Sequence, residues 1–245
     1  MSVRITLATA LRVLTQLRRD HRTVAMLLLV PSLLMVLLRY IYDDSPQVFD
    51  RIGLPLLGVF PFVIMFLVTS VAMLRERTSG TLERLLTTPM GKLDLLIGYG
   101  LAFALAAALQ AAIACATAYW LLGLDTAGSA WLVVAVAVAD AILGMATGLF
   151  VSAFARTEFQ AVQFLPAVVL PQVLLCGLFA PRETMVGWLQ ALSDVMPLSY
   201  AVEALGQVGL YSEITDRLIR DFGIIIGVAV CVLVLAAATL RRRSA

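Results

Sequence analysis

The sequence predicts an all-α membrane protein with six transmembrane helices, an amphipathic interfacial helix ahead of the first and short helices before the last. Hydrophobic residues make up 61% of the 245 residues and charged residues only 14%, whereas a soluble domain carries about 25% charged residues. Six stretches are apolar over the roughly 20 residues that a helix needs to cross a bilayer. The basic residues gather in every second connection between these stretches. Such connections lie on the same side of a membrane, and an excess of Lys and Arg is typical of its cytoplasmic side.

The six predicted spans share this length and a low content of charge. They are residues 24–42, 52–74, 95–124, 130–155, 159–181 and 222–240. The third is longer than one crossing needs, so we expect it to tilt or to extend beyond the membrane. The first contains Pro31 and has Arg39 near its end, and it resembles a signal peptide in position. Because no small-residue cleavage site follows it, we expect it to be retained as a transmembrane helix.

Six spans place both termini on one side, and the Lys and Arg residues predict which side that is. The N-terminal segment, residues 75–94, residues 156–158 and the C-terminal tail hold thirteen of the eighteen Lys and Arg. The opposite segments hold five, together with ten acidic residues. We therefore predict a multi-pass protein of the cell membrane with both termini in the cytoplasm and a basic cytoplasmic tail at residues 241–245.

Residues 1–23 are predicted to form a cytoplasmic amphipathic helix. One face of this helix is apolar, and its members are Leu7, Ala10, Leu11, Leu14 and Leu17. Arginines occupy other parts of the wheel, which is typical of a helix lying in the membrane interface with its basic side near phosphates. The helix would act either as a surface anchor or as a docking element for a partner.

Residues 182–221 lie on the opposite, extracellular side and are predicted to form a pair of short helices. They are too many for a passive connection, and Glu183, Asp194 and Glu203 are too closely spaced for a further span. We expect these helices to cap the outer membrane face or dip into it.

The connection after the second span, residues 75–94, is predicted to carry a short amphipathic helix. Gly80 is an acceptable N-cap, and the charge of Glu83 suits the N-terminus of the helix. Pro89 ends the segment. Leucines and a methionine share one face, namely Leu82, Leu85, Leu86 and Met90. A rigid short helix on a cytoplasmic loop can transmit force from a soluble partner; an ordinary solvated turn is the alternative.

This connection, RERTSGTLERLLTTPMGKLDLLIGYGL, resembles the loop after the second span in the permease subunits of type-2 ABC exporters. The resemblance covers nearly the whole chain, including LQALSDVMPLSYAVEAL before the last span, and is nearest to the small drug- and antibiotic-exporting permeases of the daunorubicin-resistance type. It implies that two permeases, identical or related, pair around a central path and that each docks one cytoplasmic ATPase subunit. ATP and magnesium would bind in that ATPase, and no cofactor is expected in this chain.

The resemblance also implies which residues receive the ATPase motion. In the family, the corresponding loop rests in a cleft of the ATPase, with Glu83 and Arg84 matching its polar contacts. The residues assigned to ATPase coupling in this way are Gly80, Thr81, Leu82, Glu83, Arg84, Leu85 and Leu86.

The second and fifth spans carry features expected of a transport path. Prolines are predicted to interrupt both, at Pro55 and Pro61 in the second and at Pro166 and Pro171 in the fifth. In the family these two helices line the central cavity. The predicted path residues are Phe60, Phe62, Phe66, Phe164, Leu175, Phe179 and Asp140. Lipid-facing phenylalanines would look the same in sequence. A mostly uncharged lining favours a hydrophobic or amphipathic cargo such as a drug, an antibiotic or a lipid.

Asp140 is the only acidic residue deep in a predicted span, and an intramembrane ionisable group is a functional hypothesis by default. It would bind a cationic substrate, relay protons or hold helices together; a plain helix–helix interface is the alternative. Gly144 and Gly148 follow at the GxxxG spacing that permits close helix approach. An ion-coupled secondary transporter or channel using Asp140 is the rival function, and a non-transporting sensor or assembly subunit is a third.

Enzymatic chemistry has little support in the sequence. The pair Gly91–Lys92 lacks a phosphate-binding loop, because Leu86 and Leu93 stand where that motif needs glycine and a hydroxyl residue. With His21 as the single histidine, neither a histidine-based metal site nor a serine–histidine site is plausible. We expect a permease without its own ATPase site, in contact with membrane lipid and without a nucleic-acid partner.

Overall fold

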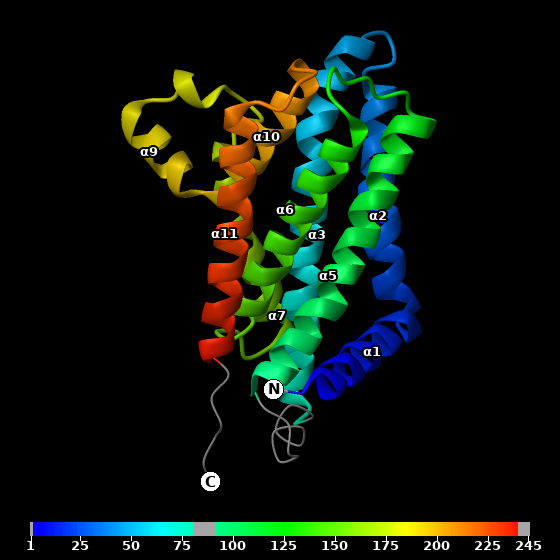
Figure 1. Ribbon diagram of the computed structural model, residues 1–245, viewed down its shortest axis with the longest axis vertical. Coiled ribbons are helices and arrows are strands. Elements are labelled where there is room, and N and C mark those ends of the chain that lie inside the picture. Colours follow the sequence, from blue (N-terminus) through cyan, green and yellow to red (C-terminus); the bar gives the residue numbers. More distant parts are fainter. Residues whose placement is uncertain (1, 81–91, 240–245) are drawn as a thin grey trace.

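The computed structural model describes residues 2–80 and 92–239, and six helical segments there are long and apolar enough to cross a membrane. Figure 1 shows these segments running roughly along the long axis of the molecule. Four of them are single helices: α2 (His21–Ile41), α3 (Pro46–Thr78), α6 (Ala130–Val151) and α11 (Asp216–Thr239). Two are composite: α5 (Lys92–Ala116) continues into the π-helix η1 (Thr117–Leu121), and α7 (Glu158–Phe164) continues through the π-helix η2 (Leu165–Val169) into α8 (Leu170–Leu175). The predicted fold class and its six spans are confirmed.

The centre of the bundle is a close contact between α3 and α6. A Cβ atom added to Gly144 would lie 2.3 Å from the carbonyl oxygen of Phe62, and one added to Gly148 would lie 2.4 Å from that of Phe66. The hydroxyl of Thr69 donates a hydrogen bond to the carbonyl oxygen of Met145 at 3.1 Å, across the same contact. The small residues at the GxxxG spacing therefore serve helix packing, and their partner is α3.

The prolines act differently in the two helices where they were expected to cause breaks. Helix α3 runs unbroken through Pro55 and Pro61, so the prediction that they interrupt it was wrong. Transmembrane helices tolerate proline because neighbouring groups and local adjustments satisfy the freed backbone carbonyls. In the fifth span Pro166 lies in the π-helical segment η2, and Pro171 is at the start of α8, so that span does change its helical geometry.

Helix α1 (Val3–Arg19) lies across one end of the bundle, at an angle to the other helices (Figure 1). It turns its Thr6, Thr9, Ala10 and Val13 side toward the protein and leaves Leu7 exposed. Asp20 follows and caps α2, because its carboxylate accepts hydrogen bonds from the backbone N–H and the hydroxyl of Thr23, at 3.2 and 2.7 Å. We call this end of the bundle the α1 end.

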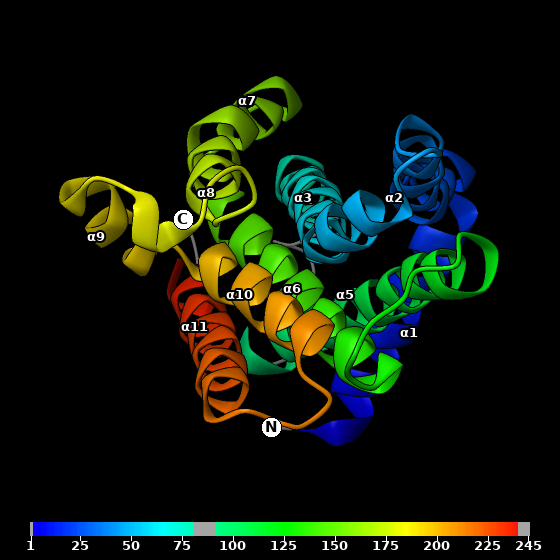
Figure 2. The same cartoon turned by 90° about the horizontal axis from the view of Figure 1, so that it is seen from above.

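The opposite end carries two short helices, α9 (Gly187–Val195) and α10 (Pro197–Leu210), as predicted, after the short 3-10 turn η3 (Arg182–Thr184). Helix α10 packs onto the bundle with Leu198, Ala201 and Leu205 buried. Helix α9 projects sideways from the bundle, as Figure 2 shows. We call this end the α10 end.

Candidate functional site

Helix α1 is fixed to the first turns of α5. The carboxylate of Asp94 accepts hydrogen bonds from the backbone N–H of Ser2 at 2.9 Å and from the hydroxyl of Thr6 at 3.3 Å. Gly98 lets the two helices approach, since an added Cβ would lie 2.7 Å from the Cβ of Thr9. The start of the α1 helix is therefore held against α5.

Arg12 extends this attachment from α5 to α3. Its guanidinium donates a hydrogen bond to the hydroxyl of Tyr99 and stacks over the Tyr99 ring, 5.5 Å from the centroid. It also lies 3.6 Å from Oε1 of Glu76, near the end of α3. Tyr99 is buried, so its ring anchors the arginine inside the protein.

Arg75, one residue before Glu76, links α3 to two other elements. Its guanidinium donates two parallel hydrogen bonds to Glu158 at the start of α7, Nε to Oε1 at 2.8 Å and Nη2 to Oε2 at 3.0 Å. Its Nη1 lies 3.8 Å from Oδ2 of Asp20, at the corner between α1 and α2. The pKa of Asp20 is lowered, chiefly by the Thr23 hydrogen bonds and to a lesser degree by the positive charge of Arg75. One side chain thus holds the ends of three helices.

A cavity of about 720 Å³ lies among these ion pairs at the α1 end. Its walls come from α1, α2, α3, α5 and α7, and its lining combines apolar residues such as Val68, Phe103 and Phe159 with the charged residues Asp20 and Glu76. We call it the α1-end cavity. No local pattern in the sequence marks this cavity, because its lining comes from five separate parts of the chain.

The predicted ATPase-coupling segment begins where α3 ends. Helix α3 includes Arg75 and continues to Thr78, and Gly80 follows with φ of +71°, a left-handed conformation that glycine adopts without strain after a helix. The remaining coupling residues, Thr81, Leu82, Glu83, Arg84, Leu85 and Leu86, lie outside the described residues, and so does the helix predicted for them. Their role stays a prediction.

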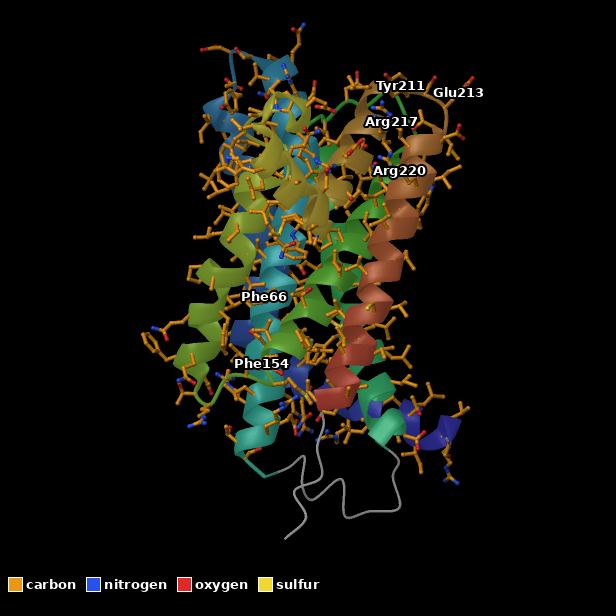
Figure 3. All side chains as sticks on the ribbon, turned by 90° about the vertical axis from the view of Figure 1, so that its left-hand side faces the viewer. Phe66, Phe154, Tyr211, Glu213, Arg217 and Arg220 are labelled. Atoms are coloured by element: carbon orange, nitrogen blue, oxygen red, sulfur yellow. The ribbon has the colours of Figure 1, made fainter. Side chains whose placement is uncertain are left out.

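The predicted path residues occupy different surroundings in the single chain. Phe62 and Phe66 are fully buried in the contact of α3 with α6, and Figure 3 marks Phe66 partway along α3. Phe60, Phe164 and Leu175 are partly buried, and Phe179 keeps 70% of its surface exposed. Assignment of these residues to a path stays a prediction, and among these phenylalanines only Phe179, after α8, is largely exposed in the single chain.

Asp140 is enclosed between helices. It is fully buried, and within the described part of the chain neither of its carboxylate oxygens has a hydrogen-bond partner. A Cβ added to Gly58 on α3 would lie 3.2 Å from its Oδ2 and 2.8 Å from Cδ1 of Leu205 on α10. Asp140 therefore sits where α6 meets α3 and α10.

The α10 end carries an ion-pair network that sequence reasoning also missed. Arg182 pairs with Glu203, Nη1 to Oε2 at 2.6 Å, and with Asp194. Arg220 on α11 reaches the same Glu203 at 3.4 Å and Asp221 at 2.7 Å. Two of the three acidic residues that argued against a span in this segment, Asp194 and Glu203, are thus partners of arginines in the same segment.

Comparisons with known proteins agree with this architecture. Residues 6–208 match the family model described as ABC-2 type transporter. The chain is similar to the "Probable multidrug ABC transporter permease YbhR" of Escherichia coli (strain K12), with 29% identity over 161 residues that cover 66% of this chain and 44% of that protein. It is similar to the "Linearmycin resistance permease protein LnrN" of Bacillus subtilis (strain 168), with 24% identity over 152 residues, 60% of this chain and 39% of that protein. The matched part spans less than half the length of either relative.

Proposed function

The chain belongs to the ABC-2 type transporter family, and from this premise we propose that it is the transmembrane permease subunit of an ATP-driven exporter. The cargo is a hydrophobic or amphipathic compound such as a drug or an antibiotic. The names of the two relatives, which state multidrug transport and linearmycin resistance, support a cargo of the drug or antibiotic class. ATP and magnesium bind in a separate ATPase subunit. The bundle lies in the cell membrane with its α1 end in the cytoplasm.

One observation carries this proposal: α3 is a single unbroken helix from Pro46 to Thr78. At a rise of 1.5 Å per residue its 33 residues extend about 50 Å, enough to pass through the membrane and beyond it. Its end is tied to α1 through Glu76 and to α7 through Arg75. A push on the residues after Gly80 therefore reaches α1, α3 and α7 together, which supports residues 75–94 as the docking loop for the ATPase.

The working complex contains two permeases, identical or related, and two ATPase subunits. The fifth span leaves much apolar surface uncovered, because only 17% of its most apolar 18 residues are buried within the chain, the same share as in α2 and α11. Large apolar residues such as Phe159, Leu174 and Phe179 remain exposed along and just beyond it. Contact with a second permease would cover this surface.

The test is a pair of substitutions in the predicted docking helix. Glu83→Ala with Arg84→Ala should detach or uncouple the ATPase and stop ATP-driven transport while membrane insertion stays intact. The matched control is Glu213→Ala with Arg217→Ala, an acidic and a basic residue that are exposed at the α10 end (Figure 3). Unchanged ATPase co-purification and transport in the Glu83 and Arg84 variant would refute the docking assignment.

A further inference from the structure

The α1-end cavity has an apolar side that is open to its surroundings. Leu67, Val68 and Val71 of α3 line it, together with Met26 of α2 and Phe159 of α7. Met26 keeps 46% of its surface exposed and Phe159 keeps 71%. Its volume of about 720 Å³ falls within the range of about 300–1,000 Å³ typical of small-molecule sites. The cavity therefore offers apolar side chains of α2, α3 and α7 to an apolar body of this size.

The charged side of the cavity is acidic. Among the described residues that line it, Asp20, Glu76 and Glu158 carry carboxylates and Arg75 carries the guanidinium. Arg12 does not line the cavity, but its guanidinium pairs with the carboxylate of Glu76 and offsets its negative charge. Even with Arg12 counted, three carboxylates face two guanidinium groups, so one negative charge is left over.

The excess charge is located on particular atoms. Arg75 gives its two parallel hydrogen bonds to Glu158 and only approaches Asp20, at 3.8 Å. Arg12 pairs with Oε1 of Glu76, while Oε2 of Glu76 is buried without a hydrogen-bond partner in the described part of the chain. The side chain of Glu76 is only 13% exposed, so water does not fully compensate it. A buried carboxylate oxygen that no donor compensates favours a positive charge close to it.

We propose that the α1-end cavity is a loading site for amphipathic organic cations. The cationic head lies near Asp20 and Glu76, and the apolar body lies along Val71 and Phe159. An anionic amphiphile of the same shape would meet the excess negative charge, and a zwitterionic lipid would bring its phosphate against the same carboxylates. This inference rests on the proposed export function and names the class of cargo, but binding itself needs neither the ATPase nor a second permease.

Binding of tetraphenylphosphonium tests the proposal, with tetraphenylborate as an anion of nearly the same shape. The full chain is placed in phosphatidylcholine nanodiscs without ATPase, and saturable binding is measured by equilibrium dialysis against empty nanodiscs. We expect saturable binding of the phosphonium and none of the borate. Equal binding of both ions, or no saturable phosphonium binding, would overturn the proposal.

Two variants place the binding in the cavity. Asp20→Asn with Glu76→Gln removes charge but keeps side-chain shape, and asparagine still caps α2; phosphonium affinity should fall at least tenfold. Val71→Trp fills the apolar side, leaves the ion pairs in place and should cause a similar loss. Glu213→Gln, at the α10 end, should leave affinity unchanged. If the double variant fails to fold, Val71→Trp decides alone, and full affinity in that variant would overturn the proposal.

Two further measurements separate this inference from its alternatives. Phosphatidylethanolamine in the nanodiscs should not displace the phosphonium; displacement would make the cavity a lipid headgroup site and overturn the proposal. Glu83→Ala with Arg84→Ala should leave phosphonium binding intact. If the ATPase docks as proposed but the phosphonium does not bind, only the loading site falls, whereas cavity-dependent binding without any ATPase docking would refute only the proposed function.

Discussion

The two ends of the bundle both hold clusters of ion pairs, but the clusters draw on different parts of the sequence. At the α1 end, Arg12 and Arg75 pair with residues far away in the chain, so each pair joins separate helices. At the α10 end, every pair of the network lies within residues 182–221. The α10-end network therefore holds one local cap together, whereas the α1-end cluster depends on how α1, α3 and α7 sit relative to one another.

This difference assigns different roles to the two ends. A cluster that joins several helices rearranges whenever those helices shift, which suits the end that receives a push. The α10-end network lies on one continuous stretch of chain and includes only the start of α11 among the spanning helices, so it depends less on how the spans sit relative to one another. The predictions below test this division, beginning with the contact that joins the two ends.

The largest effect is expected at the α3–α6 contact, through which one end would act on the other. Gly148→Ala places a methyl group about 2.3 Å from the hydroxyl oxygen of Thr69, so we expect a loss of stability of about 3 kcal/mol. Unfolding in mixed detergent with urea measures it. The control is Gly227→Ala on α11, where an added Cβ has no atom within 4 Å; a similar loss there would contradict the packing explanation.

The next effect concerns the α10-end network. Arg182 has a side chain only 12% exposed and pairs with both Asp194 and Glu203. Arg182→Gln should therefore cost about 2 kcal/mol, since hydrogen bonds to charged groups contribute about 1.5–3 kcal/mol. Limited proteolysis should then cut first near α9. The exposed Arg217→Gln serves as control, and equal protease resistance of both variants would show that the network does not hold the cap.

At the α1 end the expected effect on stability is smaller and the effect on transport larger. Arg75 and Glu158 are more than half exposed, so Arg75→Lys should change stability by less than about 1 kcal/mol. Lysine cannot make the two parallel hydrogen bonds to Glu158, so α7 should follow α3 less closely and transport per ATP hydrolysed should fall. Transport and ATPase rates in proteoliposomes measure this ratio. An unchanged ratio would place the coupling elsewhere.

The smallest effect is expected between the two ends, at Asp140. Asparagine has nearly the same shape, and Asp140 is enclosed by α3 and α10 without a hydrogen-bond partner in the described chain. Asp140→Asn should leave ATP-dependent transport unchanged. The ion-coupled rival would be favoured instead if two results came together: the variant loses transport, and transport by the parent protein does not require ATP.

Much of the fold was predictable because hydropathy and helical spacing are local properties. Residues 52–74 predicted α3, although the helix extends to Thr78 because Arg75 and Arg77 continue it beyond the apolar window. The spacing of Gly144 and Gly148 predicted a close contact with another helix. It did not predict that this helix is α3, because the spacing carries no information about the partner. Pro61 was misleading, because the surroundings of a helix decide whether proline breaks it.

The site was less predictable, because it depends on contacts between distant residues. Arg75 and Glu158 meet only after the second and fifth spans pack, and no local pattern marks that meeting. Tyr99 lies in an apolar run, and its role becomes visible only with Arg12 beside it. The docking residues were assigned by family resemblance, and apart from Gly80 they lie outside the described residues.

The central claim is that an ATPase holds the segment after Gly80 and drives the bundle from the α1 end. A photoreactive group introduced at position 84 tests this directly in cells that also express the partner ATPase subunit, with position 213 as the reference. We predict that irradiation crosslinks the ATPase at position 84 and not at position 213. A crosslink at 213, or ATP-driven transport with no crosslink at 84, would contradict the account.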